Sequence, residues 1–312
     1  MKADRWAAIA ESGSARALRL GGWLARRIGR RLSMALLWPA ALYFYARNGH
    51  ARRGSRQYLE RVWASVEGRA VLGSRPDGVM VLRHIYEFGA ALYDRMLVWS
   101  GNIDAMTVEK DGVERFFELV RSGRGALLLG AHLGSIDMLW FLSKEYDLVV
   151  NVVAFYGNAE RINSFFQSLS PGSRLRVIDI DPGSVRAAFQ IRACLERGEF
   201  VVILADRVAP GKTGRVAQTS FLGHPAHFPL EPFLLACVLG CPTYLTLCVR
   251  TGDAHYDTAL RLLSDGSRSP RGERDKRARE ILEKYVTELE SLCVRHPFQW
   301  FNYYEFWEAS DT

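Results

Sequence analysis

The stretch GRGALLLGAHLGSID, residues 123–137, carries the strongest fold signal in the chain. Its apolar run ALLL is bounded by glycines, which is typical of a short strand buried on both faces. A helix pattern follows at residues 136–145. A buried strand followed directly by a helix predicts the first unit of a sheet with helices packed on its faces.

Working outward from this stretch, strand and helix patterns alternate along the rest of the chain. Strands are expected at residues 147–157, 175–180, 199–206 and 242–250, and helices at residues 160–169, 184–196 and 230–240. Residues 255–263 predict an added antiparallel strand, and residues 273–295 a long amphipathic helix. Upstream, residues 56–68 and 79–99 predict helices. The pattern favours an α/β fold: a mixed, mostly parallel sheet flanked by helices.

The charge of the chain is distributed unevenly. The 312 residues carry a net charge of +7, but residues 1–56 alone hold twelve basic and two acidic side chains, which leaves the remainder slightly acidic. Within this basic segment, residues 32–46 are uncharged, contain four aromatic side chains and have arginines on both flanks. We therefore predict two parts: a basic, amphipathic, membrane-associated segment at residues 1–56 and an α/β domain at residues 57–312.

The apolar run at residues 32–46 leaves its mode of membrane contact open. It is shorter than the roughly 20 residues that a membrane span needs, and Pro39 interrupts it, so an interfacial helix or a single partial insertion fits best. The alternative is a helix that is buried in the core and preceded by a solvated basic segment. A nucleic-acid-binding arm is disfavoured because such arms are polar rather than aliphatic and aromatic.

One histidine and one aspartate follow the strand that opens the fold. Sites in α/β sheets form at the carboxyl ends of strands, and His132 and Asp137 are placed at such an end. A carboxylate on one imidazole nitrogen fixes the tautomer and makes the other nitrogen a general base. Taken alone this spacing is weak, because a histidine with a purely structural role gives the same pattern.

The residues around His132 add a resemblance to a known family. GAHLGSID resembles the H-x4-D/E motif of the lysophospholipid acyltransferase superfamily, nearest to the bacterial lipid A acyltransferases. The resemblance runs from residue 32 to residue 307 and includes GEFVVILADR, TSFLGHPAHFPLEPFLLA and QWFNYYEFW. It implies that His132 is the base and Asp137 its orienting partner. It also implies an acyl thioester of acyl carrier protein or coenzyme A as co-substrate, with no bound cofactor, and a lipid hydroxyl as acceptor.

Two departures from this family pattern concern the acceptor. Residues 133–136 read Leu-Gly-Ser-Ile, where lipid A enzymes often carry an aromatic-Gly-Asn-Trp run, and Asp206-Arg207 stands where they usually have Asp-Gln. Both departures lie beside the two catalytic positions. They point to a relative with another lipid substrate. The acceptor itself stays open at this level: a lipid A precursor, a lysophospholipid, or a specialised lipid or pigment hydroxyl.

Further residues are candidates for binding the substrates. Asp206 and Arg207 end a strand, and Lys212 and Arg215 follow in the loop RVAPGKTGR, where cationic side chains suit a donor phosphate or an anionic headgroup. The remaining candidates are Gly134 and, by loose family match, Arg161. A solvated loop explains Lys212 and Arg215 equally well, and a surface helix is the simpler reading of Arg161.

Several other chemistries lack their motifs. The sequence contains no G-x-S-x-G elbow, no G-x4-G-K-[ST] loop and no G-x-G-x-x-G fingerprint. His224 and His227 have neither helical spacing nor an acid or thiol to complete a metal site, so no metal is expected. The five cysteines lack CxxC spacing and predict buried free thiols. The aromatic residues 298–307 predict a packed closing segment, and lining of an acyl slot or contact with lipid are the alternatives.

These patterns favour a membrane-associated acyltransferase at the cytoplasmic face of a bacterial inner membrane, with an anionic membrane surface as partner and no nucleic acid. Two alternatives stay open at this level. A lipid hydrolase would use water in place of the acceptor, and a non-catalytic lipid-binding protein would use the histidine structurally.

Overall fold

A computed structural model describes most of the chain. The described residues are 15–99, 106–111, 114–138, 143, 146–154, 174–179, 185–208 and 214–307. The helix expected at residues 160–169 lies outside these ranges.

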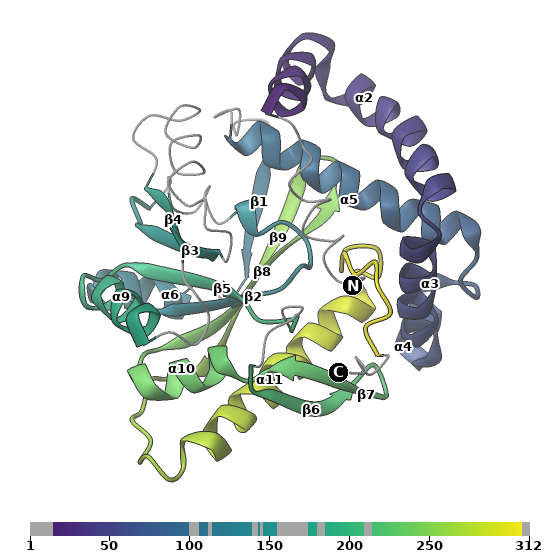
Figure 1. Cartoon of the computed structure of the whole chain (residues 1–312). Coiled ribbons are helices and arrows are strands. Elements are labelled where there is room, and N and C mark those ends of the chain that lie inside the picture. Colours follow the sequence, from purple (N-terminus) through teal and green to yellow (C-terminus); the bar gives the residue numbers. More distant parts are fainter. Residues whose placement is uncertain are drawn as a thin grey trace.

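A seven-stranded sheet forms the centre of the described structure (Figure 1). In spatial order its strands are β1 (Thr107–Asp111), β9 (His255–Ser264), β8 (Thr243–Gly252), β2 (Leu127–Gly130), β5 (Phe200–Leu204), β3 (Val150–Ala154) and β4 (Leu175–Asp179). The strands from β8 to β4 are parallel to one another, whereas β9 is antiparallel to β8 and parallel to β1. The mixed, mostly parallel sheet is therefore confirmed.

Helices flank this sheet, as the alternating pattern predicts. They are α2 (Ala15–Arg47), α3 (Gly49–Ala64), α4 (Val66–Leu72), α5 (Gly78–Trp99), α6 (Glu114–Arg121), the 3-10 turn η1 (Ile136–Met138), α9 (Val185–Glu196), α10 (Glu231–Leu239) and α11 (Arg274–Arg295). Figure 1 shows α2 and α3 along one side of the molecule, and α11 passing the strands near β2.

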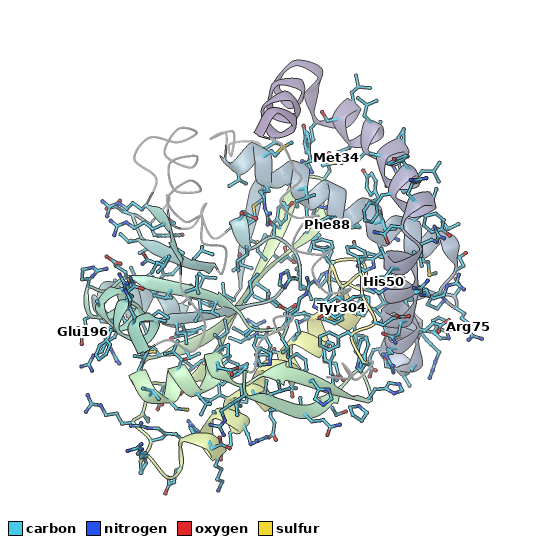
Figure 2. The ribbon with its side chains drawn as sticks, viewed as in Figure 1. Met34, His50, Arg75, Phe88, Glu196 and Tyr304 are labelled. Atoms are coloured by element: carbon cyan, nitrogen blue, oxygen red, sulfur yellow. The ribbon has the colours of Figure 1, made fainter. Side chains whose placement is uncertain are left out.

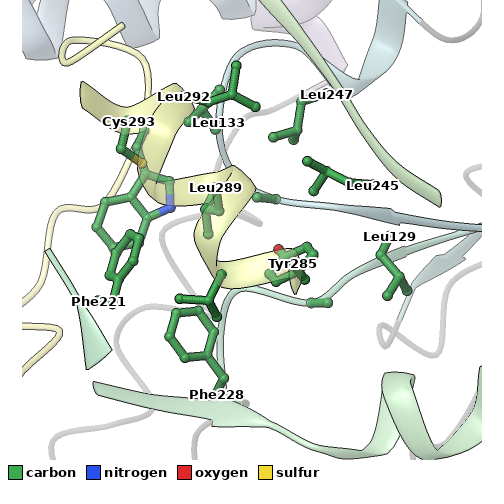
Figure 3. Close-up of a cluster of buried hydrophobic side chains, with 14 of the residues drawn as sticks. Leu129, Leu133, Phe221, Phe228, Leu245, Leu247, Tyr285, Leu289, Leu292 and Cys293 are labelled. Carbon is green, nitrogen blue, oxygen red and sulfur yellow. The ribbon is translucent and has the colours of Figure 1, made fainter. Parts of the chain in front are cut away.

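The two faces of the sheet belong to two separate cores, because side chains alternate along each strand. Leu127 and Leu129 of β2 pack in the cluster with α3, α10 and α11, and Leu128 packs in the cluster with α5 and α6. Figure 3 shows the first cluster, in which Leu289 and Tyr285 of α11 face the strands. Burial of β2 on both faces explains why its sequence is continuously apolar.

Some elements carry no prediction from the sequence, among them helix α6, strand β1 and a separate hairpin. Strand β1 reads TVEKD and lies at the edge of the sheet, so its polar composition hides the strand pattern. Strands β6 (Val216–Phe221) and β7 (His224–Pro229) form a separate hairpin. Its turn is Leu222-Gly223, where both residues have positive φ, of 50° and 74°, as a two-residue hairpin turn of this hand requires.

The basic N-terminal segment forms a long helix that is kinked at Gly29, where φ is 75° and ψ is 162°. Pro39 lies inside this helix rather than ending it. Beyond the kink the segment packs on the α/β body, because Met34, which is labelled in Figure 2, is buried in its cores together with Ala41 and Ala51. Among the described residues, no helix is both long and apolar enough to cross a membrane.

Candidate active site

His132 and Asp206 meet at the carboxyl edge of the sheet. Strands β2 and β5 are parallel neighbours, and the amide of Ala205 donates to the carbonyl of Gly130, so the two strands end side by side. His132 Nδ1 lies 2.8 Å from Asp206 Oδ1, and the backbone N–H of His132 donates to Asp206 Oδ2 at 3.0 Å. Residues that are 74 positions apart are thereby held in two-point contact.

The environment of Asp206 sets the proton arrangement of this pair. Burial by itself raises the pKa of the Asp206 carboxyl, but the charge and hydrogen bonds of His132, together with Arg207, hold its pKa well below the ordinary value. Asp206 is therefore ionised and accepts the proton of Nδ1–H. This leaves Nε2 of His132 as the unprotonated nitrogen, on a side chain that is 36% exposed. A neutral imidazole with this tautomer is a general base.

The closing segment at residues 299–301 contacts both members of this pair. The indole N–H of Trp300 donates to Asp206 Oδ2 at 3.0 Å, and Trp300 is fully buried. On either side of it, the amide of Phe301 donates to the carbonyl of His132, and the amide of Gly134 donates to the carbonyl of Gln299. The packed closing segment expected from its aromatic residues is thus present, and its backbone hydrogen bonds hold the loop that carries His132 in place.

Gly134 has a backbone role in this loop. Its φ is 68°, a conformation that other residues rarely adopt, and a Cβ atom at this position would lie 2.0 Å from the carbonyl oxygen of Cys248 in β8. The sequence interpretation placed Gly134 among the substrate-binding residues. The contacts described here are with the protein's own backbone.

The structure gives the contact at His132 Nδ1 to Asp206, which differs from the expectation that Asp137 orients the imidazole. Asp137 lies in η1, and its Oδ2 accepts a hydrogen bond from Nε of Arg95 in α5 at 2.6 Å. The physical reason is the register of the chain: β5 lies directly beside β2, so its end carries Asp206 to the imidazole. The family-based role of Asp137 stays a prediction.

Arg207 lies beside the pair, as its place at the strand end suggests. Its Nη2 donates to the carbonyl of Phe301 at 2.6 Å, and its guanidinium carbon is 5.6 Å from the ring centre of Tyr304. Its Nε lies 3.9 Å from Asp206 Oδ2 and has no hydrogen-bond partner among the described residues. About a quarter of the side chain is exposed, so this cation has capacity to meet a substrate oxygen.

The other predicted binding residues are not brought to this site by the contacts that are described. Arg215 forms an ion pair with Asp275, and its amide donates to Glu231. Asp275 lies in the first turn of α11, about 15 Å along the helix from Tyr285, whose hydroxyl donates to the carbonyl of Gly130. Arg161 and Lys212 lie outside the described residues.

Among the described residues, no group of three or more acidic, histidine or cysteine side chains has the geometry of a metal site. His224 and His227 are exposed residues of strand β7, an odd number of positions apart, so their side chains leave opposite faces of the strand. The five cysteines are free and buried, as expected from their spacing.

Sequence reasoning did not foresee the contact of Asp206 with His132 or the hydrogen bond from Trp300 to Asp206. Asp206 stood among the candidates because it ends a strand, but nothing in the sequence says that β5 is the neighbour of β2. Trp300 was included only in an aromatic closing segment. The signal that could have flagged it is the polar Gln299 and Asn302 within an otherwise aromatic run, since such residues bind backbone groups in buried segments.

The fold and site define an α/β protein that holds a histidine–aspartate pair at the carboxyl edge of its sheet. Residues 81–307 match the model of the bacterial lipid A biosynthesis acyltransferase family. Since this match spans most of the chain, the protein belongs to that family. A comparison with curated proteins returned no match. Membership supports an acyltransferase that acts on lipid, in agreement with the resemblance of the GAHLGSID motif.

Proposed function

We propose that this protein transfers a fatty acyl group from a thioester, of acyl carrier protein or coenzyme A, to a hydroxyl group of a lipid acceptor. The observation that supports this reaction best is the contact of His132 Nδ1 with the buried Asp206 carboxylate, which leaves Nε2 as a partly exposed base. The family match supplies the acyltransferase class.

In the proposed reaction, Nε2 of His132 takes the proton from the acceptor hydroxyl as its oxygen attacks the thioester carbonyl. The carbon–oxygen bond forms, the carbon–sulfur bond breaks, and the proton passes from Nε2 to the departing thiolate. Asp206 stabilises the transient imidazolium. Arg207 is the cation nearest this pair in the described contacts, and we assign it the negative charge that develops on the carbonyl oxygen.

The test compares purified wild-type protein with His132→Ala, using an acyl thioester and extracted membrane lipid. Thiol release and ester formation are both measured. We expect His132→Ala to lose both, whereas His227→Ala, at an exposed histidine of β7, keeps the wild-type rate. Equal activity in His132→Ala would overturn the mechanism.

The same assay separates the alternatives. Thiol release that does not depend on added lipid would identify a hydrolase. Lipid capture without turnover in the wild-type protein would identify a non-catalytic lipid-binding protein. Mass spectrometry of membrane lipids with and without the active protein names the acceptor, because its unacylated form accumulates when the activity is missing.

We further propose that α2 attaches the protein to an anionic membrane surface, at the cytoplasmic face of the inner membrane. Leu32, Leu36 and Tyr43 are each more than half exposed, and their spacing places them on one face of the helix. Arg31 and Arg47, also exposed, flank this apolar face. Such a face with cations at both ends suits the boundary between headgroups and acyl chains.

Sedimentation with liposomes that contain anionic lipid tests this attachment. Because Met34, Ala41 and Ala51 are part of the cores, point variants are preferable to deletion of the segment. We expect the double variant Leu36→Glu, Tyr43→Glu to move the protein to the supernatant. Phe189→Glu is the matched control, since Phe189 of α9 is 65% exposed but lies outside this helix. Equal pelleting of all three proteins would contradict the attachment.

A further inference from the structure

Trp300 makes a contact that hydrophobic packing does not require. Its ring packs edge-on against Tyr58, Phe221 and Phe306, contacts that a phenylalanine ring would also supply. Its indole N–H, however, donates to Asp206 Oδ2. An N–H directed at a buried carboxylate is a charge-assisted hydrogen bond, and it holds the carboxylate in one orientation.

A buried histidine holds the main chain of Trp300. Nε2 of His84 lies 2.9 Å from the carbonyl oxygen of Trp300, and Nδ1 lies 2.8 Å from the hydroxyl of Ser55. A carbonyl only accepts hydrogen bonds, so Nε2 carries the proton and Nδ1 accepts from Ser55. Burial lowers the pKa of His84 to about 4, which keeps the ring neutral with this single tautomer.

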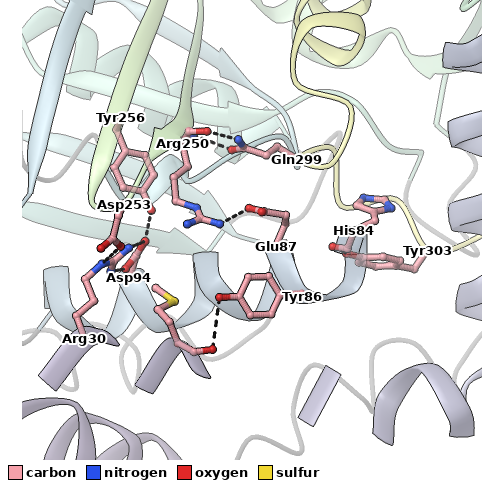
Figure 4. Close-up of polar contacts among 11 residues, drawn as sticks. Arg30, His84, Tyr86, Glu87, Asp94, Arg250, Asp253, Tyr256, Gln299 and Tyr303 are labelled. Carbon is pink, nitrogen blue, oxygen red and sulfur yellow. Dashed lines mark hydrogen bonds and ion pairs between the residues drawn. The ribbon is translucent and has the colours of Figure 1, made fainter. Parts of the chain in front are cut away.

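The elements around His84 fix its place. The hydroxyl of Tyr303 donates to the carbonyl of His84, as the two residues' proximity in Figure 4 illustrates. Helix α3 lies against the closing segment at Gly54, where a Cβ atom would lie 2.5 Å from the amide nitrogen of Tyr304. Since α3, α5 and the closing segment interlock here, the carbonyl of Trp300 has little freedom to move.

These contacts form a continuous path from Ser55 through His84, Trp300 and Asp206 to His132. We propose that Trp300 is a positioning residue for the catalytic base, acting through Asp206, and that His84 in turn holds Trp300 in place. This inference rests on the proposed function, because it assigns a role in the reaction of His132. Trp300 and His84 thereby set the orientation of the base through Asp206.

The decisive variant is Trp300→Phe, which keeps an aromatic ring but removes the N–H. Without this donor the Asp206 carboxylate acts more strongly on the imidazolium of His132, so both the acid limb of the kcat/KM profile and the ring titration move to higher pH, by roughly half a unit or more. Loss of orientation lowers kcat about tenfold, with little change in KM. Trp307→Phe is the control, because the N–H of Trp307 donates to the carbonyl of Phe221 instead.

A shift in the His132 titration is assigned to Trp300 only if the other groups around Asp206 keep their charge. Besides His132 and Trp300, the groups that interact electrostatically with Asp206 are Arg207, Tyr285, Cys293 and Tyr304. Burial raises the pKa of Tyr285, Cys293 and Tyr304, so all three stay neutral across the working range. Neither tryptophan substitution alters any of them.

The titration of the His132 ring, followed by nitrogen-15 NMR and assigned with His132→Ala, needs no turnover. It therefore tests the positioning role even if the acyl transfer assay fails, and the two failures are distinguishable. A folded Trp300→Phe protein with the wild-type titration midpoint and acid limb would overturn the inference.

Variants of His84 carry the test independently, including the case in which Trp300→Phe does not fold. His84→Leu removes both hydrogen bonds, whereas His84→Gln retains an amide donor for the carbonyl of Trp300. We expect His84→Leu to shift the His132 titration in the same direction as Trp300→Phe, and His84→Gln to restore it partly. Wild-type titration in both His84 variants would contradict the role of His84.

Discussion

Two aspartates in this protein, Asp94 and Asp206, are fully buried. Each accepts a hydrogen bond from an aromatic side chain, but their basic partners differ. Asp206 contacts His132 and accepts the indole N–H of Trp300. Asp94 of α5 contacts Arg30 of α2 and accepts the hydroxyl proton of Tyr256 in β9, as Figure 4 shows. Each carboxylate thus has a hydrogen-bonded basic partner and an aromatic donor, but only one of the two arrangements is suited to chemistry.

The difference lies in the basic partner. An arginine stays protonated at any working pH, and Asp94 and Asp253 raise the pKa of Arg30 further although burial by itself lowers it. The pair of Asp94 and Arg30 therefore works as a fixed anchor that fastens α2 to the body just beyond the kink at Gly29. An imidazole exchanges its proton near neutral pH, and His132 is partly exposed, so the pair at the sheet edge can take part in a reaction.

The largest expected effect concerns the pair of Asp206 and His132. Asp206→Asn removes the charge that fixes the tautomer of His132, and we expect kcat to fall about a thousandfold or more. Initial rates of thioester consumption measure the loss. The matched variant Asp94→Asn loses stability, but its folded fraction keeps a rate close to that of the wild-type protein. Similar rates for the two variants would remove the distinction between a reactive pair and an anchor.

The next effect concerns the anchor itself. Asp94→Asn leaves the partly buried guanidinium of Arg30 without its main charged partner, so we expect the free energy of unfolding to fall by about 3 kcal/mol. Asp253→Asn removes the other carboxylate of Arg30, but this group is 67% exposed, so a loss below about 1 kcal/mol is expected. Urea unfolding followed by circular dichroism measures both values. Equal losses would show that burial of Asp94 adds nothing to the anchor.

The third effect sharpens the comparison through pH. The pKa of the buried His84 is about 4, against about 6.5 in an unfolded chain, so the unfolded state binds a proton first as the pH falls. The free energy of unfolding therefore falls by about 3 kcal/mol between pH 6.5 and pH 4. Urea unfolding at several pH values measures this slope.

His84→Gln should flatten this slope, and His227→Gln, at an exposed position, should keep it. Asp206 acts in a different window. Because its folded pKa is depressed, its contribution to stability is present at neutral pH and is lost only as the pH falls below about 4, the ordinary carboxyl value. A His84→Gln protein with the wild-type slope from pH 6.5 to 4 would contradict the assignment of the slope to His84.

Much of the fold could be predicted because strongly apolar, regular elements have a clear periodicity in the sequence. The buried strands at residues 127–130 and 200–204 and the helix at residues 274–295 lie within or next to their predicted ranges. The antiparallel strand at residues 255–264 was also predicted, and its pairing with β8 confirms it. Strand β1 and the hairpin of β6 and β7 were missed, since an edge strand and a separate hairpin do not need continuous apolar runs.

The site was predictable to a smaller extent. His132 follows a buried strand, and this local signal placed it at the carboxyl edge, where the structure has it. Asp137 was the nearest carboxylate in sequence, but the contact at Nδ1 of His132 belongs to Asp206, which is 74 positions away. Trp300, Arg95 and His84 each act through partners that are far away along the chain, and no spacing rule reaches them.

By itself the sequence determined most of the strands and helices, the apolar side of each, the basic character of the first 56 residues, and the family motif around His132. These follow from local composition and periodicity, which are written residue by residue. The order of the strands in the sheet was decided only in the tertiary structure, because it depends on how all helices pack at once. That order puts the ends of β2 and β5 side by side, and the packing of the closing segment and of α2 does the rest, so the tertiary structure decided which carboxylate contacts His132 and which one anchors a helix.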